Sequence, residues 1–307
     1  MDIQNSYRKI IEIMKNILEE IAARTRERIA KEKSRISVSE LENRIQEVNK
    51  NARNRITLLQ ALQKDGMSYI CEVKKASPSK GLIAPDFPYL AIAKEYEQAG
   101  ASAISCLTEP FYFQGADQYL REIAATVQIP VLRKDFTVDE YMIYQAKSLG
   151  ASAVLLICAI LDDGELRAYR QLAKELGLDA LVEAHDEYEV DRALNLGAEI
   201  VGVNNRDLRT FQVDMNNSIR LRKMAPDNVV FVSESGIRTP EDIRLLYENK
   251  VDAKPEQESS AGKPEWQPVT LKDRILSERI EYDQRTTAKN QNQNLWSETP
   301  GRHYLCK

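Results

Sequence analysis

Short apolar runs alternate with amphipathic segments along the middle of the chain. The runs predict seven strands, at residues 69–73, 103–107, 130–132, 153–160, 180–182, 200–203 and 229–232. They are continuously apolar, which indicates strands that are covered on both faces, as in a parallel sheet. The segments between them predict helices at residues 89–98, 139–149, 163–176, 187–196 and 240–249.

Glycines mark the ends of four predicted helical segments. Gly100, Gly150, Gly177 and Gly197 each stand two or three residues before the next apolar run. Glycine suits the left-handed backbone that commonly follows a helix. A repeated strand and helix unit is the simplest account of this pattern.

The period alone fits either a barrel or an open doubly wound sheet. Two features favour an α/β fold of the TIM (β/α)8 type, namely the lack of a GxGxxG motif after the first strand and polar residues after nearly every strand. These strand-end residues are Glu72 and Lys74, Thr108 and Glu109, Lys134 and Asp135, Cys158, Glu183, Asn204 and Asn205, and Glu234 and Ser235.

The flanks of the repeat have a different character. Helical spacing of apolar residues predicts helices at 7–34, 38–48 and 51–63, with Ser37 and Ser39 as candidate caps. We therefore divide the chain into an N-terminal helical extension at 1–66, a barrel at 67–253 and a polar, partly disordered tail at 254–307. The tail contains both tryptophans and a marginal helix at 271–282.

Composition narrows the function. The 43 basic and 47 acidic residues give a formal charge of -4, so the chain lacks the basic field that drives binding to nucleic acid. No apolar stretch is long enough to span a membrane. The four cysteines, without CxxC spacing, suggest free thiols in a reducing compartment. We expect a cytoplasmic protein, with an organelle left open.

The densest group of candidate site residues follows the first strand. Glu72 and Lys74 point to the same side of a strand, where they could bind an acid-bearing substrate or exchange protons with it. A structural ion pair is the alternative interpretation. Ser77, Ser79 and Gly81 then predict a flexible, hydroxyl-rich loop that contacts phosphate.

Two more ionisable residues end predicted strands. Lys134 in a partly desolvated barrel mouth would have a lowered pKa and could act as a general acid or a Schiff-base nucleophile. Glu183 could act as a base. A solvated lysine and a surface carboxylate are the alternatives. His185 lacks a second ligand cluster, since the other histidine is His303, and we expect no metal site.

The last two strands end in groups that suit an anion. Asn204 and Arg206 follow the sixth strand, although Arg206 and Asp207 could simply pair with neighbours. The seventh strand ends in Glu234, and Ser235 and Gly236 then turn towards a helix. Backbone amides and a hydroxyl at such a turn predict a phosphate cradle.

Together these motifs resemble the indole-3-glycerol phosphate synthase family, over residues 17–253. The shared motifs occur in the family's order and spacing, and they are EVKKASPS at 72–79, LRKDF at 132–136, VEAH at 182–185, NNRDL at 204–208 and SESGI at 233–237. The helical extension before the first strand also fits. The resemblance implies a carboxy-lyase of tryptophan biosynthesis, which needs no cofactor and could associate with other enzymes of that pathway.

The resemblance also implies roles for individual residues. The substrate would be 1-(2-carboxyphenylamino)-1-deoxyribulose 5-phosphate, which closes a ring with loss of CO2 and water. Lys134 would be the general acid and Glu183 the base. The remaining expected catalytic residues are Glu72, Lys74, Asn204 and Glu234, and the expected phosphate ligands are Ser77, Arg206, Ser235 and Gly236.

The chain departs from the family after residue 253, where an apolar eighth strand and a Gly-rich phosphate turn are expected. Lys254 and Pro255 stand there instead, and Pro268 interrupts the next candidate strand at 266–271. We expect the eighth unit to be missing or replaced, leaving two open sheet edges and an incomplete phosphate site. Three readings are left open: an enzyme of this family, with or without impaired activity; a non-catalytic descendant that serves for binding; and a related phosphosugar barrel isomerase, against which the Glu72 and Lys74 pair argues.

Overall fold

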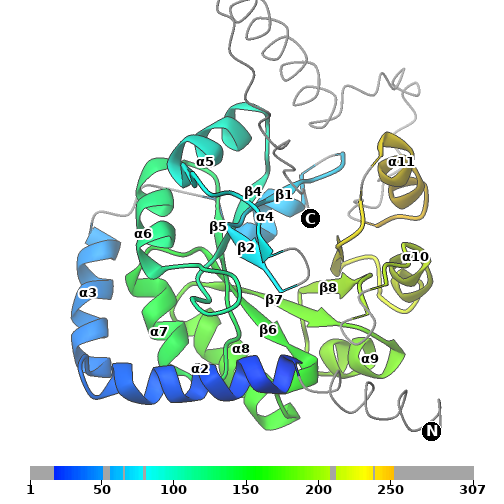
Figure 1. The fold of residues 1–307 in the computed structure, drawn as a ribbon. Coiled ribbons are helices and arrows are strands. Elements are labelled where there is room, and N and C mark those ends of the chain that lie inside the picture. Colours follow the sequence, from blue (N-terminus) through cyan, green and yellow to red (C-terminus); the bar gives the residue numbers. More distant parts are fainter. Residues whose placement is uncertain are drawn as a thin grey trace, which may run out of the picture.

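The computed structural model describes residues 17–50, 56–64, 66–78, 81–207, 212–237 and 239–251. Within these residues, one curled sheet has the strand order β1-β4-β5-β6-β7-β8-β9, and every neighbouring pair is parallel (Figure 1). The strands are β1 (Ile70–Val73), β4 (Ala103–Leu107), β5 (Val131–Lys134), β6 (Ala153–Ile157), β7 (Asp179–Ala184), β8 (Ile200–Asn204) and β9 (Val230–Glu234). Sequential parallel order is the arrangement of a (β/α) barrel.

Helices connect successive strands and surround the sheet (Figure 1). They are α5 (Tyr89–Gln98), α6 (Asp117–Thr126), α7 (Tyr141–Ser148), α8 (Asp163–Glu175), α9 (Glu187–Asn195) and α10 (Asn216–Arg222), and α11 (Pro240–Glu248) follows β9. None of the described helices is long and apolar enough to cross a membrane.

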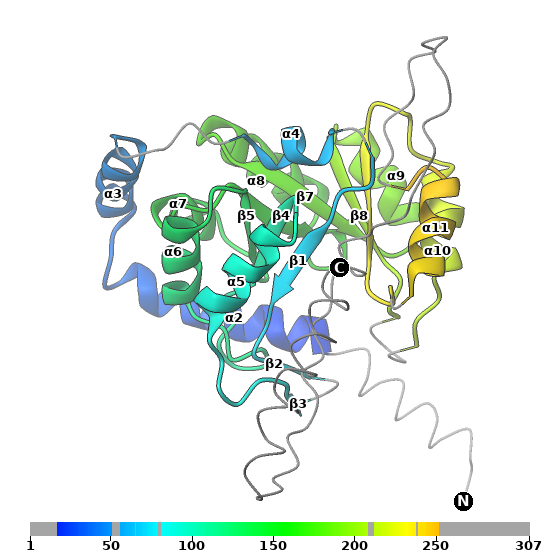
Figure 2. The same cartoon turned by 90° about the horizontal axis from the view of Figure 1, so that it is seen from above.

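Three helices precede the sheet, namely α2 (Ile17–Lys33), α3 (Val38–Lys50) and α4 (Leu58–Leu62). The Ser37 hydroxyl accepts the Glu40 amide at 3.2 Å, which confirms one candidate cap of α3. Figure 2 shows α2 at the end of the sheet where the short hairpin of β2 (Ala76–Ser77) and β3 (Gly81–Leu82) lies, and α4 at the other end. The extension thus contacts both ends.

Most predicted elements are confirmed, with differences at their ends. The strand predicted at 153–160 stops at Ile157, because Arg192 binds the carbonyls of Cys158 and Leu161 and the chain forms the 3-10 helix η1 (Cys158–Ile160). Helices α6 and α10 and the hairpin were not predicted. Residues 56 and 57 lie outside a helix, so the predicted 51–63 helix is only partly right.

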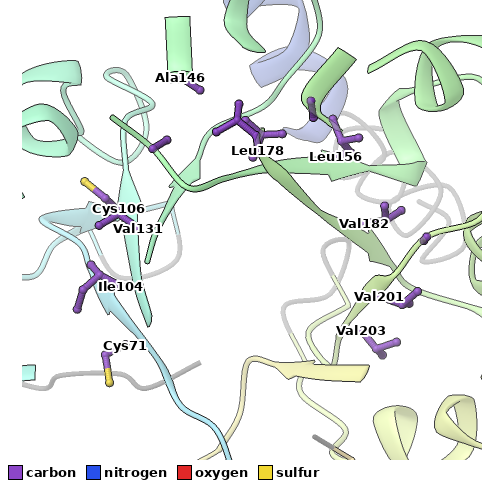
Figure 3. Packing of buried hydrophobic residues seen from close by; sticks show 14 of the residues in the cluster. Cys71, Ile104, Cys106, Val131, Ala146, Leu156, Leu178, Val182, Val201 and Val203 are labelled. Carbon is purple, nitrogen blue, oxygen red and sulfur yellow. The ribbon is translucent and has the colours of Figure 1, made fainter. Parts of the chain in front are cut away.

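The two faces of the sheet bury different sets of side chains. Outward residues such as Cys71, Ile104 and Val201 pack under the surrounding helices (Figure 3). Inward residues such as Leu132 and Leu181 form a second cluster, which Ile21 of α2 and Leu58 and Leu62 of α4 join. The cluster closes the inside of the curled sheet. The continuous apolar runs are therefore explained by burial on both faces.

Strands β1 and β9 are the terminal strands of this sheet in the part of the chain that the structure describes. Val251, fully buried, is the last described residue. The candidate strand at 266–271, the predicted helix at 271–282 and the tail at 254–307 lie outside the described residues. The fold is of the TIM type, with seven described strands in its parallel sheet.

Candidate active site

The inner face of the sheet changes from apolar to charged along each of several strands. Alternate residues of a strand share a face, so an inward apolar residue is followed two positions later by an inward polar one. The pairs are Ile70 and Glu72 in β1, Leu132 and Lys134 in β5, Leu181 and Glu183 in β7, and Val232 and Glu234 in β9. The charged residues therefore gather at the carboxyl ends of the strands, inside the curl.

Lys134 is the centre of this group. Its amine donates to Glu183 Oε2 at 2.7 Å and to Glu234 Oε2 at 2.8 Å, although the two glutamates lie 49 and 100 residues away in the chain. All three residues are buried, with exposed fractions of 8%, 3% and 2%. The predicted convergence of Lys134 and Glu183 on one site is present in the structure.

The expected pKa shift of Lys134 was in the wrong direction. Burial alone would lower the pKa of this amine, as the sequence interpretation assumed, but the charges of Glu183, Glu234 and Glu72 outweigh burial and raise it above its usual value. Lys134 is consequently protonated at neutral pH. That state suits a proton donor, whereas a Schiff-base nucleophile needs a neutral amine.

Glu72 and Lys74 form an ion pair at the end of β1, the contact named above as the alternative interpretation, with Glu72 Oε1 accepting from the Lys74 amine. The Glu72 side chain is 1% exposed and that of Lys74 is 11% exposed. Since Glu72 also raises the pKa of Lys134, the pair belongs electrostatically to the same site. A buried cation here can hold a substrate carboxylate.

Asn204 completes the group from β8. Its Nδ2 donates to Glu183 Oε1 at 3.2 Å, and its Oδ1 accepts the Arg206 backbone amide at 3.1 Å. Gly202, one inward position earlier, leaves room for Glu234, because a Cβ there would collide with Glu234 Oε1. The amide thus fixes the orientation of the Glu183 carboxylate.

Ser235 and Gly236 form the expected turn after β9. Both have positive φ, 66° and 90°. Asn205 fixes the turn, because its Nδ2 donates to the Ser235 carbonyl at 3.1 Å and to Ser233 Oγ at 2.9 Å. Its Oδ1 accepts from Ser218 on α10. Asn205 therefore has a scaffolding part that the sequence did not indicate.

The other two expected phosphate ligands, Ser77 and Arg206, lie on other elements than the turn after β9. Ser77 is buried in β2 and pairs with Gly81 of β3 in antiparallel register, so these two residues of the expected loop lie in short strands. Ser79 lies outside the described residues. Arg206 starts the connection after β8, where it bridges to Val213. No hydrogen bond links Ser77 or Arg206 to Ser235 within the described residues.

A second buried charge network lies on the outer face of β5, and sequence reasoning missed it. Arg133 donates to Thr108 Oγ1 at 3.1 Å, to the Met142 carbonyl at 3.1 Å and to Asp117 Oδ1 at 3.0 Å. Asp135 accepts from Arg28 of α2 at 2.9 and 3.1 Å. The only signal in the sequence was that Arg133 and Asp135 flank Lys134.

His185 follows β7 and pairs with Glu189, with 3.8 Å between Nδ1 and Oε2. Burial would lower its pKa, but the hydrogen bond to Glu189 and the charge of Glu183 outweigh burial and raise it. Among the described residues, no three His, Cys, Asp or Glu side chains are arranged to hold a metal ion. Cys71, Cys106 and Cys158 are buried thiols, as expected.

Comparison with known proteins gives a consistent result. A family model described as indole-3-glycerol phosphate synthase matches residues 18–254. Proteins of that name from Ruminiclostridium cellulolyticum and Lacticaseibacillus paracasei are each 54% identical, over 231 and 230 residues, covering 75% of this chain and 88% of each relative. One from Endomicrobium trichonymphae is 51% identical over 237 residues, covering 77% of this chain and 91% of its own.

Proposed function

Because the chain belongs to the indole-3-glycerol phosphate synthase family, we propose that it closes the indole ring of 1-(2-carboxyphenylamino)-1-deoxyribulose 5-phosphate, with loss of CO2 and water. The observation that carries this proposal is Lys134, held protonated between two buried carboxylates at the mouth of the barrel. An acid and a base in contact suit a reaction that needs a proton added and then removed.

Lys134 acts first. Its ammonium donates a proton to the ribulose carbonyl oxygen while the carbonyl carbon bonds to the ring carbon that carries the carboxylate. The carboxylate then leaves as CO2, and its bonding electrons return to the ring. Because the pKa of Lys134 is raised, its amine carries this proton throughout the neutral pH range.

Glu183 acts in the dehydration. It removes a proton from the carbon next to the one bearing the hydroxyl group that Lys134 formed and passes that proton to the hydroxyl group, which leaves as water as the ring double bond forms. Its basicity rises once Lys134 has given up its proton, because the ion pair at 2.7 Å then loses its positive member. Asn204 holds the carboxylate in place through its 3.2 Å hydrogen bond. Proton donation by Lys134 therefore makes Glu183 a stronger base for the dehydration.

The remaining residues bind and orient the substrate. Lys74 pairs with the substrate carboxylate, while Glu72 and Glu234 stabilise positive charge that develops on the reacting nitrogen. The backbone at Ser235 and Gly236 receives the phosphate, and Ser77 and Arg206 add a hydroxyl and a cation. The phosphate would lie beside the β9 turn that Asn205 supports.

The same proposal includes a cytoplasmic location, contact with other enzymes of tryptophan synthesis, and the organisation into an extension at 1–66, a barrel at 67–253 and a tail at 254–307. A non-catalytic protein that only binds the phosphorylated compound is the alternative. The departure from the family pattern after residue 253 is the observation that favours it.

Turnover separates the two. The purified full chain is mixed with the carboxyphenylamino ribulose phosphate, and indole fluorescence is followed beside Lys134→Ala. We expect signal from the wild type and none from the variant. A folded wild type without signal overturns the enzyme, and equal signals overturn the role of Lys134.

A further inference from the structure

The loop that follows β4 is built around a buried carboxylate. Glu109 is fully buried, and its side chain accepts three successive backbone amides, from Phe111 at 2.9 Å, Tyr112 at 2.7 Å and Phe113 at 3.0 Å. Its backbone carbonyl accepts the Gly115 amide at 2.8 Å. Hydrogen bonds from amides to a carboxylate are stronger than those to a neutral acceptor. One side chain therefore holds the whole loop at 109–115.

The loop has little room to shift. A Cβ on Gly115 would lie 2.5 Å from the Leu107 carbonyl oxygen, so the chain passes directly against the end of β4. Gln114 has a φ of 50°, in the left-handed region that most side chains avoid. The contacts of Glu109 offset this unfavourable backbone.

Phe113 connects the loop to the segments that follow the proposed catalytic lysines Lys74 and Lys134. Its carbonyl accepts the Ala76 amide at 3.2 Å, two residues after Lys74. Its ring lies 6.3 Å from that of Phe136, two residues after Lys134. The loop thus lies between the end of β1 and the end of β5.

The N-terminal helix contacts the same loop. The Tyr112 hydroxyl donates to Glu20 of α2, and the Arg24 guanidinium lies 4.6 Å from the Phe111 ring centre. Movement of the loop would therefore disturb three neighbours at the mouth of the barrel.

We propose that Glu109 is a positioning residue for the activity proposed above, on which this inference rests. Through the three amides it fixes the Phe113 carbonyl, which in turn fixes Ala76 and the Lys74 segment. Lys134 is held separately, by Glu183 of β7 and Glu234 of β9. Loss of the Glu109 carboxylate therefore weakens substrate binding at Lys74 and leaves the Lys134 proton transfer in place.

The test substitutes Glu109→Gln in the full chain. Glutamine keeps the size but has one acceptor oxygen, and its NH2 group faces backbone N–H groups. We expect KM to rise about tenfold while kcat stays within about threefold, the pattern of lost substrate binding. A KM equal to that of the wild type, or a loss confined to kcat, overturns the proposal.

The matched control is Glu97→Gln. Glu97 Oε1 also accepts two backbone amides, of Gln128 at 2.5 Å and Ile129 at 3.2 Å. Gln128 and Ile129 lie in the loop before β5, which is at the opposite end of the sheet from the proposed site. Both variants lower the unfolding temperature, and Glu97→Gln should keep KM and kcat. An equal rise of KM in both variants would mean that general loosening is the cause.

Amide hydrogen exchange at Ala76 tests the link without turnover. Faster exchange is expected in Glu109→Gln and not in Glu97→Gln, and unchanged exchange in Glu109→Gln overturns the proposal whatever the kinetics. If the wild type forms no indole, the proposed function fails, while exchange at Ala76 still decides the role of Glu109. Gly115→Ala, which must displace the loop, should raise KM similarly and serves if Glu109→Gln does not fold.

Discussion

Two buried charge networks start from neighbouring residues of β5 and differ in what their charges can do. Lys134 points into the curled sheet, whereas Arg133 and Asp135 point outward, because successive side chains of a strand alternate between its faces. The same short stretch of sequence supplies both networks. The end of β5 thus places a proposed catalytic residue on its inner face and stabilising residues on its outer face.

The outer network is closed and balanced. Two cations, Arg28 and Arg133, face two carboxylates, Asp117 and Asp135, and each nitrogen of Arg133 donates to an acceptor. Thr108 adds a 2.7 Å hydrogen bond to Asp135. Every nitrogen of Arg133 and both oxygens of Asp135 are engaged within the network, so we assign it to stability, tying α2 to the sheet.

Within the described residues, the inner network has a different charge count. Two cations, Lys74 and Lys134, face three carboxylates there, those of Glu72, Glu183 and Glu234. The excess of negative charge favours a substrate that becomes positive as it reacts. Among the described residues, the two networks therefore differ in charge balance.

The largest effect is expected for Lys134→Ala. Loss of the general acid should lower kcat at least about a thousandfold, within the range for such groups. Indole formation by folded protein measures it, with folding checked by circular dichroism. Lys33→Ala, which removes the exposed pair with Asp139, is the control and should change nothing. Activity within tenfold of the wild type would break the assignment of chemistry to the inner network.

The next effect is expected for Glu183→Gln. The amide can still accept from Asn204 but cannot take a proton, so kcat should fall roughly a hundredfold or more. Steady-state kinetics measure it. The control is Glu122→Gln on α6. It replaces the carboxylate that accepts the hydrogen bond of the Tyr89 hydroxyl and should keep full activity. If Glu183→Gln turned over normally, the base of the dehydration would have to be a different residue of the site.

Arg133→Met should show the opposite pattern. Removing one member of a buried ion network costs about 3–5 kcal/mol of unfolding free energy, because its carboxylates lose a partner. Urea unfolding measures the loss. The kcat of the folded fraction should stay within about threefold, since Lys134 keeps both of its carboxylates. A variant that is as stable as the wild type but inactive would mean that the outer network takes part in catalysis, against this division of roles.

The smallest effect concerns acid stability. Burial alone would raise the pKa of Asp135, but the charges of Arg28 and Arg133 and the Thr108 hydrogen bond outweigh it, so the pKa is lowered. A lowered pKa contributes stability that is present above the usual value of 3.8 and is lost as pH falls through the folded value. In Asp135→Asn, unfolding free energy should therefore be lower at neutral pH and fall less below about pH 4. Parallel acid limbs in the two proteins would contradict this role.

Much of the fold could be predicted from local pattern. The apolar runs marked all seven strands of the parallel sheet, and the five helices predicted between or after these strands lie close to their predicted ranges. The α6 helix was not predicted although Leu120, Ile123 and Ala124 are buried at helical spacing, because no glycine follows its C-terminal end at Val127. The β2–β3 hairpin could not be predicted, since it depends on the distant Phe113 carbonyl.

The candidate site divides in the same way. Strand ends and motif spacing identified Lys134, Glu183 and Glu234, whereas Glu109 was noted only as a polar residue after a strand. Its three amide partners follow from the turn of the loop. The part played by Arg28 had no local signal, since Asp135 is 107 residues away.

The sequence by itself determined the repeated βα units, the family and the residue types at the strand ends, because these depend on periodicity and order along the chain. Only the tertiary structure decided which charges meet and therefore the direction of the Lys134 pKa shift. Burial and Coulomb interaction act through space. The curl of the sheet places Glu183 and Glu234 within 3 Å of an amine that is distant from them in the chain.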